Sequence, residues 1–319
     1  MAAPELIAGT PQQPRPPASA GTHKPACDGG NRNVTDNFLH ALVATLSTGP
    51  VGFSDALGYT NASLVKSTCD SSGLLLKPTL PLAAIDRTWA ASSTVVQVPA
   101  GSFVWATHTA VRSSSSSSST PGGGGRIANG SRSNGRGGNN GNALVWYMVL
   151  AISVAEDWSL VRADMYPTLS PAQDVVVWDF VQGPQSAKLV AANTVDLASL
   201  QSTSGGHVGG MAFAYKLVAP VLAETGGWAV LGEPNKLTPV SEQRNWQFEA
   251  GRVGMDKAAA AASASSSLTV KITNRDAVGE TVMVAAWKDG KVYEMTAQID
   301  SNGEGVFVFH ANVGSAGGG

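Results

Sequence analysis

Aspartates are the side chains of this sequence that could do chemistry, because cleavage of a glycosidic bond usually needs two carboxyl groups that face one cleft. Six aspartates are available for such a pair, and their spacing singles out no two of them: Asp55, Asp70, Asp86, Asp164, Asp174 and Asp179. Asp174 and Asp179 flank the apolar run 175–178. Because carboxylates at such places usually mark the solvated ends of a strand, we expect both to be exposed.

Asp55 follows the short apolar run 51–54, which the chain enters from Gly49-Pro50. The sequence leaves two roles open for its carboxylate. It could cap a loop by accepting hydrogen bonds from backbone N–H groups. Alternatively, Asp55 lies at the carboxyl end of a barrel strand, where that architecture places its ligand contacts. Asp55 is therefore the candidate that the sequence offers for substrate binding.

Other catalytic chemistries lack the residues that they need. The five histidines, at positions 23, 40, 108, 207 and 310, are not at metal-ligand spacing, and two cysteines are too few for a four-ligand zinc site. Gly101-Ser102 lacks the second glycine of a serine-nucleophile elbow. The glycine-rich tract after Pro121 lacks the Gly-Lys-Ser/Thr ending of a phosphate-binding loop. We therefore expect no metal, no cofactor and no catalytic residue.

Tryptophans could serve as stacking platforms for sugar rings. Five of the eight lie inside apolar runs and are expected in the core: Trp105, Trp146, Trp178, Trp228 and Trp287. The other three have more polar neighbours and are therefore expected to be available to a partner: Trp89, Trp158 and Trp246.

The composition argues against several classes of partner. With 21 basic and 23 acidic residues the chain is nearly neutral, so nucleic acid is not an expected partner. No apolar run approaches the roughly 20 residues that cross a bilayer. Residues 1–17 have no basic region followed by an apolar one, so no secretory signal is predicted. Three sequons would matter only in a secreted chain: Asn33, Asn61 and Asn129.

Most of the elements that must position these residues are short strands, so we expect a mainly β fold. Helical periodicity is confined to 38–46 and 61–67. Strands are expected at 51–55, 93–98, 102–108, 143–152, 174–180, 187–191, 211–217, 227–231, 268–273, 281–287, 292–299 and 306–310. Asp289-Gly290 predicts a tight hairpin. Short strands separated by turns in this rhythm are typical of a β-sandwich.

Composition also divides the chain into segments. Residues 1–34, 112–142 and 312–319 are rich in small and polar residues and are expected to be disordered. The alanine and serine run 258–267 is expected to be a linker. The rest of the sequence forms three regions, at 35–90, 91–257 and 268–311, and the second of them contains the insertion 112–142.

Several motifs carry a family resemblance. The stretches 46–58, 64–66 and 69–78, which are LSTGPVGFSDALG, LVK and CDSSGLLLKP, resemble the last barrel strand and following helix of glycoside hydrolase family 36, the raffinose synthase and α-galactosidase group. Leu76-Lys77-Pro78 and Ala84-Ile85-Asp86 also resemble motifs of uncharacterised glycosidase-like proteins. The stretch 227–233, with Val240-Ser241, is similar to their C-terminal β-domain.

The resemblance implies that 35–90 is the remnant of a (β/α)₈ barrel end and that a β-sandwich region follows it. The family's catalytic aspartates, a nucleophile and an acid/base, belong to earlier barrel strands, and only Asp55 matches a barrel position in this chain. The implied function is the C-terminal part of a hydrolase acting on α-galactosides or related glycans, not catalytic by itself. The alternative is a non-catalytic binding or scaffold module that recognises protein or glycan.

Overall fold

The computed structural model describes residues 37–52, 60–93, 103–112, 143–154, 158–167, 169–201, 207–208, 211–251 and 267–311. All of them belong to one compact unit, Thr35–Gly319. The segments that we expect to be disordered lie outside the described residues, apart from Arg112. Asp55 lies outside them too, as does the linker 258–267 apart from Ser267.

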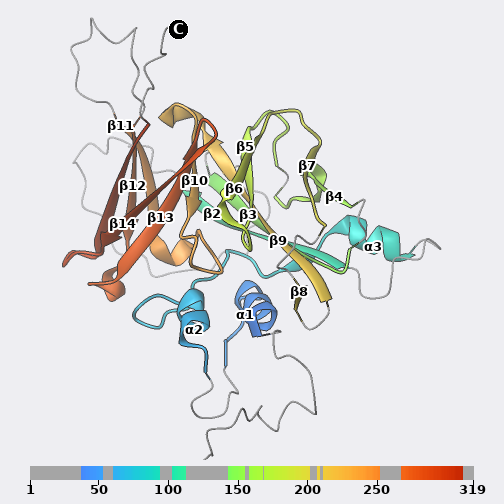
Figure 1. Cartoon of the computed structure of the whole chain (residues 1–319), viewed down its shortest axis with the longest axis horizontal. Helices are drawn as coiled ribbons and strands as arrows, with labels where there is room; N and C mark the ends of the chain where they lie inside the picture. Colours follow the sequence, from blue (N-terminus) through green and yellow to red (C-terminus); the bar gives the residue numbers. More distant parts are fainter. Residues whose placement is uncertain are drawn as a thin grey trace, which may run out of the picture. The chain divides into compact units, whose positions relative to one another are not determined.

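Antiparallel strands make up about half of the described residues and helices far fewer, which confirms a mainly β fold (Figure 1). The α-helices are α1 (Asn37–Leu46), α2 (Ala62–Thr68) and α3 (Asp86–Ser93). The strands are β1 (Ala83–Ala84), β2 (Phe103–Arg112), β3 (Ala143–Ile152), β4 (Ser159–Val161), β5 (Val175–Asp179), β6 (Gly183–Val190), β7 (Asp196–Ser199), β8 (His207–Val208), β9 (Met211–Leu222), β10 (Trp228–Gly232), β11 (Trp246–Gly251), β12 (Ser267–Thr273), β13 (Thr281–Lys288), β14 (Lys291–Gln298) and β15 (Glu304–His310). Within the described residues, no helix is long and apolar enough to cross a membrane.

The largest sheet is built around β9. Its main path runs β1-β2-β3-β9-β10-β13-β14, and β5 and β8 also pair with β9. The predicted strand 143–152 is confirmed as β3, which pairs with β2 along one edge and β9 along the other. Its alternate side chains enter two different apolar clusters, so both faces are covered. Such a strand has no solvated face, which is why its sequence is an almost continuous apolar run.

The C-terminal strands extend this sheet. Strand β13 pairs with β10, with Ala229 opposite Trp287, so the regions 91–257 and 268–311 share one sheet and one core. The hairpin predicted at Asp289-Gly290 is confirmed between β13 and β14. These two residues have φ values of 49° and 80°, the left-handed conformation that a two-residue hairpin loop of type I′ requires.

A second sheet, β11-β12-β15, includes a strand that the sequence analysis missed. In β11, Trp246 and Phe248 alternate with Gln247 and Glu249, which is the two-residue period of a half-buried strand. The expectation that Trp246 is available to a partner is wrong. It is 1% exposed, and its indole N–H donates to the Ser241 carbonyl over 2.9 Å.

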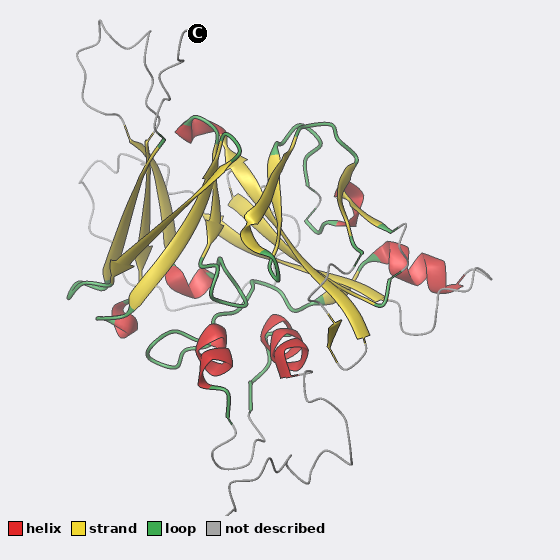
Figure 2. Ribbon diagram, viewed as in Figure 1, coloured by secondary structure: helices red, strands yellow, loops and turns green. Residues whose placement is uncertain are grey.

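The core lies on both faces of the large sheet. The strands are drawn in yellow in Figure 2. The larger cluster joins α1 and one face of β3 to the inner face of the β11-β12-β15 sheet. The smaller one packs the other face of β3 against the layer that contains β4 and β7. Four tryptophans expected in the core are buried, namely Trp146, Trp178, Trp228 and Trp287, and Trp105 is partly buried against it.

The N-terminal helices pack on this β structure. The helix predicted at 38–46 is confirmed as α1, and it buries Leu39, Leu42 and Leu46 in the larger cluster. Asn61 caps α2 by accepting hydrogen bonds from the N–H groups of Ser63 and Leu64. The predicted strand 51–55 is described only at Val51 and Gly52, which lie in a loop.

Candidate functional site

The two aspartates expected at the solvated ends of one strand differ in burial. Asp174 is exposed, as predicted, and accepts a hydrogen bond from the Ala192 N–H over 2.6 Å. For Asp179 the prediction is wrong, because its carboxylate is buried 2.6 Å from the Lys216 ammonium. Asp179 stands opposite Lys216 in the pairing of β5 with β9, so its partner comes from a strand 37 residues away in sequence.

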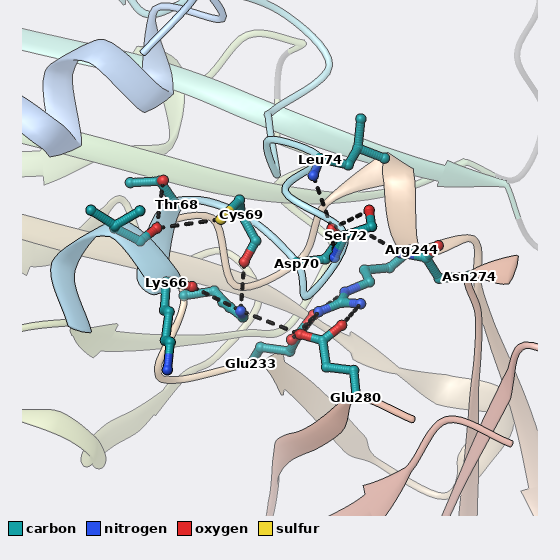
Figure 3. Close-up of polar contacts among 12 residues, drawn as sticks. Lys66, Thr68, Cys69, Asp70, Ser72, Leu74, Glu233, Arg244, Asn274 and Glu280 are labelled. Carbon is teal, nitrogen blue, oxygen red and sulfur yellow. Dashed lines mark hydrogen bonds and ion pairs between the residues drawn. The ribbon is translucent and has the colours of Figure 1, made fainter. Parts of the chain in front are cut away.

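Asp70 has a structural role. Its Oδ1 accepts hydrogen bonds from the Ser72 and Leu74 N–H groups over 2.9 Å, and its Oδ2 accepts one from the Asn274 amide over 2.7 Å (Figure 3). Burial by itself would raise the pKa of Asp70. The hydrogen bonds from Ser72, Asn274 and Leu74 outweigh burial, so the pKa lies below its usual value.

A buried group of charges lies beside Asp70, and we call Glu233, Lys236, Arg244 and Glu280 the ionic clamp. The Arg244 guanidinium, which is fully buried, donates to both oxygens of Glu233 over 2.8 and 2.9 Å and to both oxygens of Glu280 over 2.7 and 3.0 Å (Figure 3). The Lys236 ammonium donates to the carbonyls of Lys66 and Cys69 over 2.9 and 2.6 Å. The clamp therefore ties the end of α2 to the β strands.

A different group of titratable residues lines a cleft of about 540 Å³ that we call the α3 cleft. One wall is the chain from Leu80 to Arg87, which leads into α3. The other walls are β2 and the segment 161–166. The polar residues of the lining are Asp86, Arg87, Thr107, His108, Asp164 and Tyr166.

Arg87 organises one end of the α3 cleft. Its guanidinium donates to Asp164 over 2.7 Å and to the Ser159 carbonyl over 2.5 Å. Its central carbon lies 4.7 Å from the centre of the Trp158 ring, a distance typical of a cation–π contact. Burial raises the pKa of Asp164, and the Val161 N–H and Arg87 oppose that rise. Trp158, which we expected to be available to a partner, is partly buried against this arginine.

His108 lies deeper in the α3 cleft, where it is 6% exposed. Burial lowers the pKa of His108, and a hydrogen bond to the Tyr166 backbone opposes this. The imidazole is therefore neutral near pH 7. Because a neutral imidazole that donates through one nitrogen accepts through the other, His108 can accept a hydrogen bond from a ligand hydroxyl.

Tyr166 forms the rim of the α3 cleft. It is 74% exposed, and its ring meets the His108 ring edge-on with 6.4 Å between the centres. An exposed aromatic ring beside hydrogen-bonding groups is a surface on which the apolar face of a sugar can stack.

The sequence alone singles out one motif of this cleft and two of its carboxylates, Asp86 and Asp164, which are among the six candidate aspartates. Ala84-Ile85-Asp86 lies in its wall, and Asp86 is exposed in the first turn of α3. His108 and Tyr166 carry no local signal, because their pairing joins residues 58 positions apart. The side chain of Trp89 lies outside the described structure, as does the whole of Asp55.

The carboxyl of Asp164 is bonded within the cleft. Oδ2 of Asp164 accepts hydrogen bonds from both Arg87 and the Val161 N–H, so this carboxyl is already engaged in holding the arginine. No cluster of three metal-ligating side chains occurs in the part of the chain that the structure describes. The cleft thus offers an aromatic face, a hydrogen-bond acceptor and an oriented guanidinium to a ligand.

Comparison with known proteins provides no relative for this site. No family model matches the chain, and no curated protein matches it either.

Proposed function

We propose that the chain is the non-catalytic, carbohydrate-contacting C-terminal part of a family-36-like glycoside hydrolase, and that a sugar of the α-galactoside class binds in the α3 cleft. The observation that carries this proposal is the set of groups around the cleft: the exposed ring of Tyr166, the neutral imidazole of His108 and the guanidinium of Arg87, oriented by Asp164. Sugars need both stacking and hydrogen bonds, and these groups supply both.

The position of the resemblance motifs supports the same proposal. The backbone N–H of Lys77, from the Leu-Lys-Pro motif, donates a hydrogen bond to the side-chain oxygen of Gln243 over 2.9 Å. Ile85, from the Ala-Ile-Asp motif, donates to the Val104 carbonyl over 3.1 Å. The first motif is thus bonded to the turn 242–244 before β11 and the second to β2, and the second motif lines the α3 cleft. In the proposed protein, 35–90 is the end of a barrel, held to a sandwich-like region.

Sugar titration tests the proposal directly. Raffinose and methyl α-galactoside would be titrated into the full chain while amide chemical shifts are followed by NMR. We expect saturable shifts around the α3 cleft. Tyr166→Ala should weaken binding by about twofold to tenfold, taking as the scale the roughly 0.5 to 1.5 kcal/mol that a pair of aromatic rings contributes beyond its buried area. Tyr166→Phe, which keeps the ring, is the matched control and should bind like the parent chain.

Activity measurement separates this function from that of an enzyme. An aryl α-galactoside should be turned over no faster than in buffer, because hydrolysis needs two positioned carboxyl groups and the family's pair has no counterpart here. Equal sugar affinity in the parent chain and Tyr166→Ala would contradict the binding site. Turnover abolished by Asp86→Asn or Asp164→Asn would instead identify an enzyme.

A further inference from the structure

A second cleft, of about 360 Å³, lies against β5, β6 and β9 and is bordered by β7. It shares no residue with the α3 cleft. Its polar lining consists of Asp179, Gln182, Ser186, Lys188, Ser199 and Lys216. We call it the lysine cleft. Its volume is at the lower end of the range for sites that hold small molecules.

A buried ion pair forms the floor of the lysine cleft. The Lys216 ammonium lies 2.6 Å from Oδ2 of Asp179, and the two side chains are 11% and 4% exposed. Oδ1 of Asp179 also accepts hydrogen bonds from the N–H groups of Val181 and Gln182 over 2.9 and 3.3 Å. The carboxylate is thus bonded on both oxygens. The ammonium has three N–H donors, so its bond to Asp179 leaves donors that can serve a ligand.

A second ammonium comes from the neighbouring strand. Lys188 stands opposite Val177 in the pairing of β5 with β6, and both residues line the lysine cleft. Lys188 is exposed. With Lys188 and Lys216 against Asp179 alone, the lining carries one net positive charge. Gln182 and Ser199 add an amide and a hydroxyl that can bond to polar groups of a ligand.

Stability alone does not account for this arrangement. A buried ion pair seldom stabilises a fold more than apolar residues of similar volume would, because both charges lose their hydration. A pair that only held β5 to β9 would also need no second lysine and no cavity above it. An excess of ammonium donors around a cavity is instead what binding of an anion requires.

We propose that the lysine cleft binds a small anion, a carboxylate or phosphate group carried by a polar molecule of about the size of a monosaccharide. The anionic group lies between Lys188 and Lys216, and the polar remainder contacts Gln182 and Ser199. This site does not depend on the sugar site proposed above, because the two clefts have no residue in common.

Isothermal titration of the full chain with three probes of similar size tests this inference. The probes are galacturonate, galactose 6-phosphate and uncharged galactose. We expect at least one anion to bind saturably, with galactose binding there at least tenfold more weakly. Comparison of the two anions identifies whether carboxylate or phosphate is preferred. Binding should also weaken as salt rises, because the attraction between charges is screened.

Substitutions locate the anion. Lys188→Gln should weaken anion binding about tenfold or more, because a charge-assisted hydrogen bond is lost. Lys291→Gln, at the exposed start of β14, removes the same charge elsewhere and should leave binding unchanged. The double variant K216M/D179N removes the floor pair without leaving a buried carboxylate unpaired, and it should also lose the anion. Tyr166→Ala should retain it, which separates this site from the α3 cleft.

Three results would overturn the inference. The first is that neither anion binds saturably. The second is that Lys188→Gln binds the anion as tightly as the parent chain does. The third is that Lys291→Gln loses as much affinity for the anion as Lys188→Gln does. The last result would mean that the anion responds only to the overall charge of the chain.

Discussion

At the scale of single residues, burial has the clearest consequences at Arg244 and His108, where it affects ion pairs and a pKa. Arg244 is fully buried between two carboxylates, Glu233 and Glu280. Burial raises the pKa of Glu233, and Arg244 opposes that rise. For Glu280, burial would also raise the pKa, but the bonds from Arg244 outweigh it and the pKa is lowered. One guanidinium thus keeps two buried carboxylates in place.

Loss of this guanidinium should strongly lower the free energy of unfolding. Arg244→Met leaves the carboxylates of Glu233 and Glu280 without their main partner, and breaking a buried ion pair in this way typically costs about 3 to 5 kcal/mol. Chemical denaturation should show a free energy of unfolding that is lower by this amount. Lys271→Met is the control, because its pair with Glu249 is exposed at 3.6 Å and such pairs contribute less than about 1 kcal/mol. Similar losses in both variants would contradict the role of the clamp.

The pH dependence of stability should report on His108. Because burial lowers its pKa, the folded chain favours the neutral imidazole, whereas the unfolded chain takes up a proton near the ordinary value of about 6.5. This contribution to stability is complete above pH 6.5 and is lost as pH falls through the lowered pKa. Its slope is at most about 1.4 kcal/mol per pH unit.

Urea denaturation measured from pH 7.5 down to pH 5 checks this expectation. Between pH 6.5 and pH 5, His108→Gln should lose less stability than the parent chain does, because one titrating group has been removed. His40→Gln, which changes an exposed histidine of α1, is the matched control. Parallel profiles for the parent and His108→Gln would show that this imidazole does not couple to folding.

At the scale of elements, two turns that use left-handed glycines differ in their surroundings. Gly290 closes the β13–β14 hairpin with φ at 80°, and a Cβ there would meet nothing within 4 Å. Gly232 ends β10 with φ at 90°, and a Cβ there would lie 2.6 Å from the carbonyl carbon of Pro239 and 2.7 Å from the Val240 side chain. The hairpin thus needs only the backbone freedom of glycine, whereas Gly232 also needs the space.

Alanine at the two positions should therefore have different costs. Gly290→Ala should lower the free energy of unfolding by about 1 to 2 kcal/mol, the usual cost of a left-handed residue with a Cβ. Gly232→Ala adds a clash with the backbone of Pro239 and should lose at least about 1 kcal/mol more. Equilibrium unfolding of both variants measures the difference. Equal losses would show that the chain around Pro239 yields without cost.

At the scale of the whole molecule, one core connects the N-terminal helices to the C-terminal strands. Leu42 of α1 is fully buried in the cluster that also contains Phe307 and Phe309 of β15. The ionic clamp reinforces this connection, since Lys236 bonds to α2 while Glu280 precedes β13. We therefore expect α1 and the strands to unfold together.

Leu42→Ala tests this cooperativity. Removing a fully buried leucine should cost about 2 to 5 kcal/mol, depending on how far the cavity collapses. The neighbouring Val43→Ala is the control, because Val43 is 36% exposed and its truncation should cost much less. Tryptophan fluorescence and far-ultraviolet circular dichroism should show one coincident, shifted transition. Two separate transitions for the variant would mean that α1 folds independently of the sheets.

Local patterns of the sequence were sufficient to predict the positions of most strands and the residues of one hairpin turn. Helix α1 follows from the helical spacing of its apolar residues, because one face is buried. Strand β3 follows from a continuous apolar run, because both of its faces are covered. The hairpin follows from the Asp289-Gly290 pair. Tertiary structure decided which side chains meet. Asp179 finds Lys216 at a separation of 37 residues, Arg87 finds Asp164 at 77, and Asp70 finds Asn274 at 204. Sheet pairing and chain packing create these contacts, and no period within one segment encodes them.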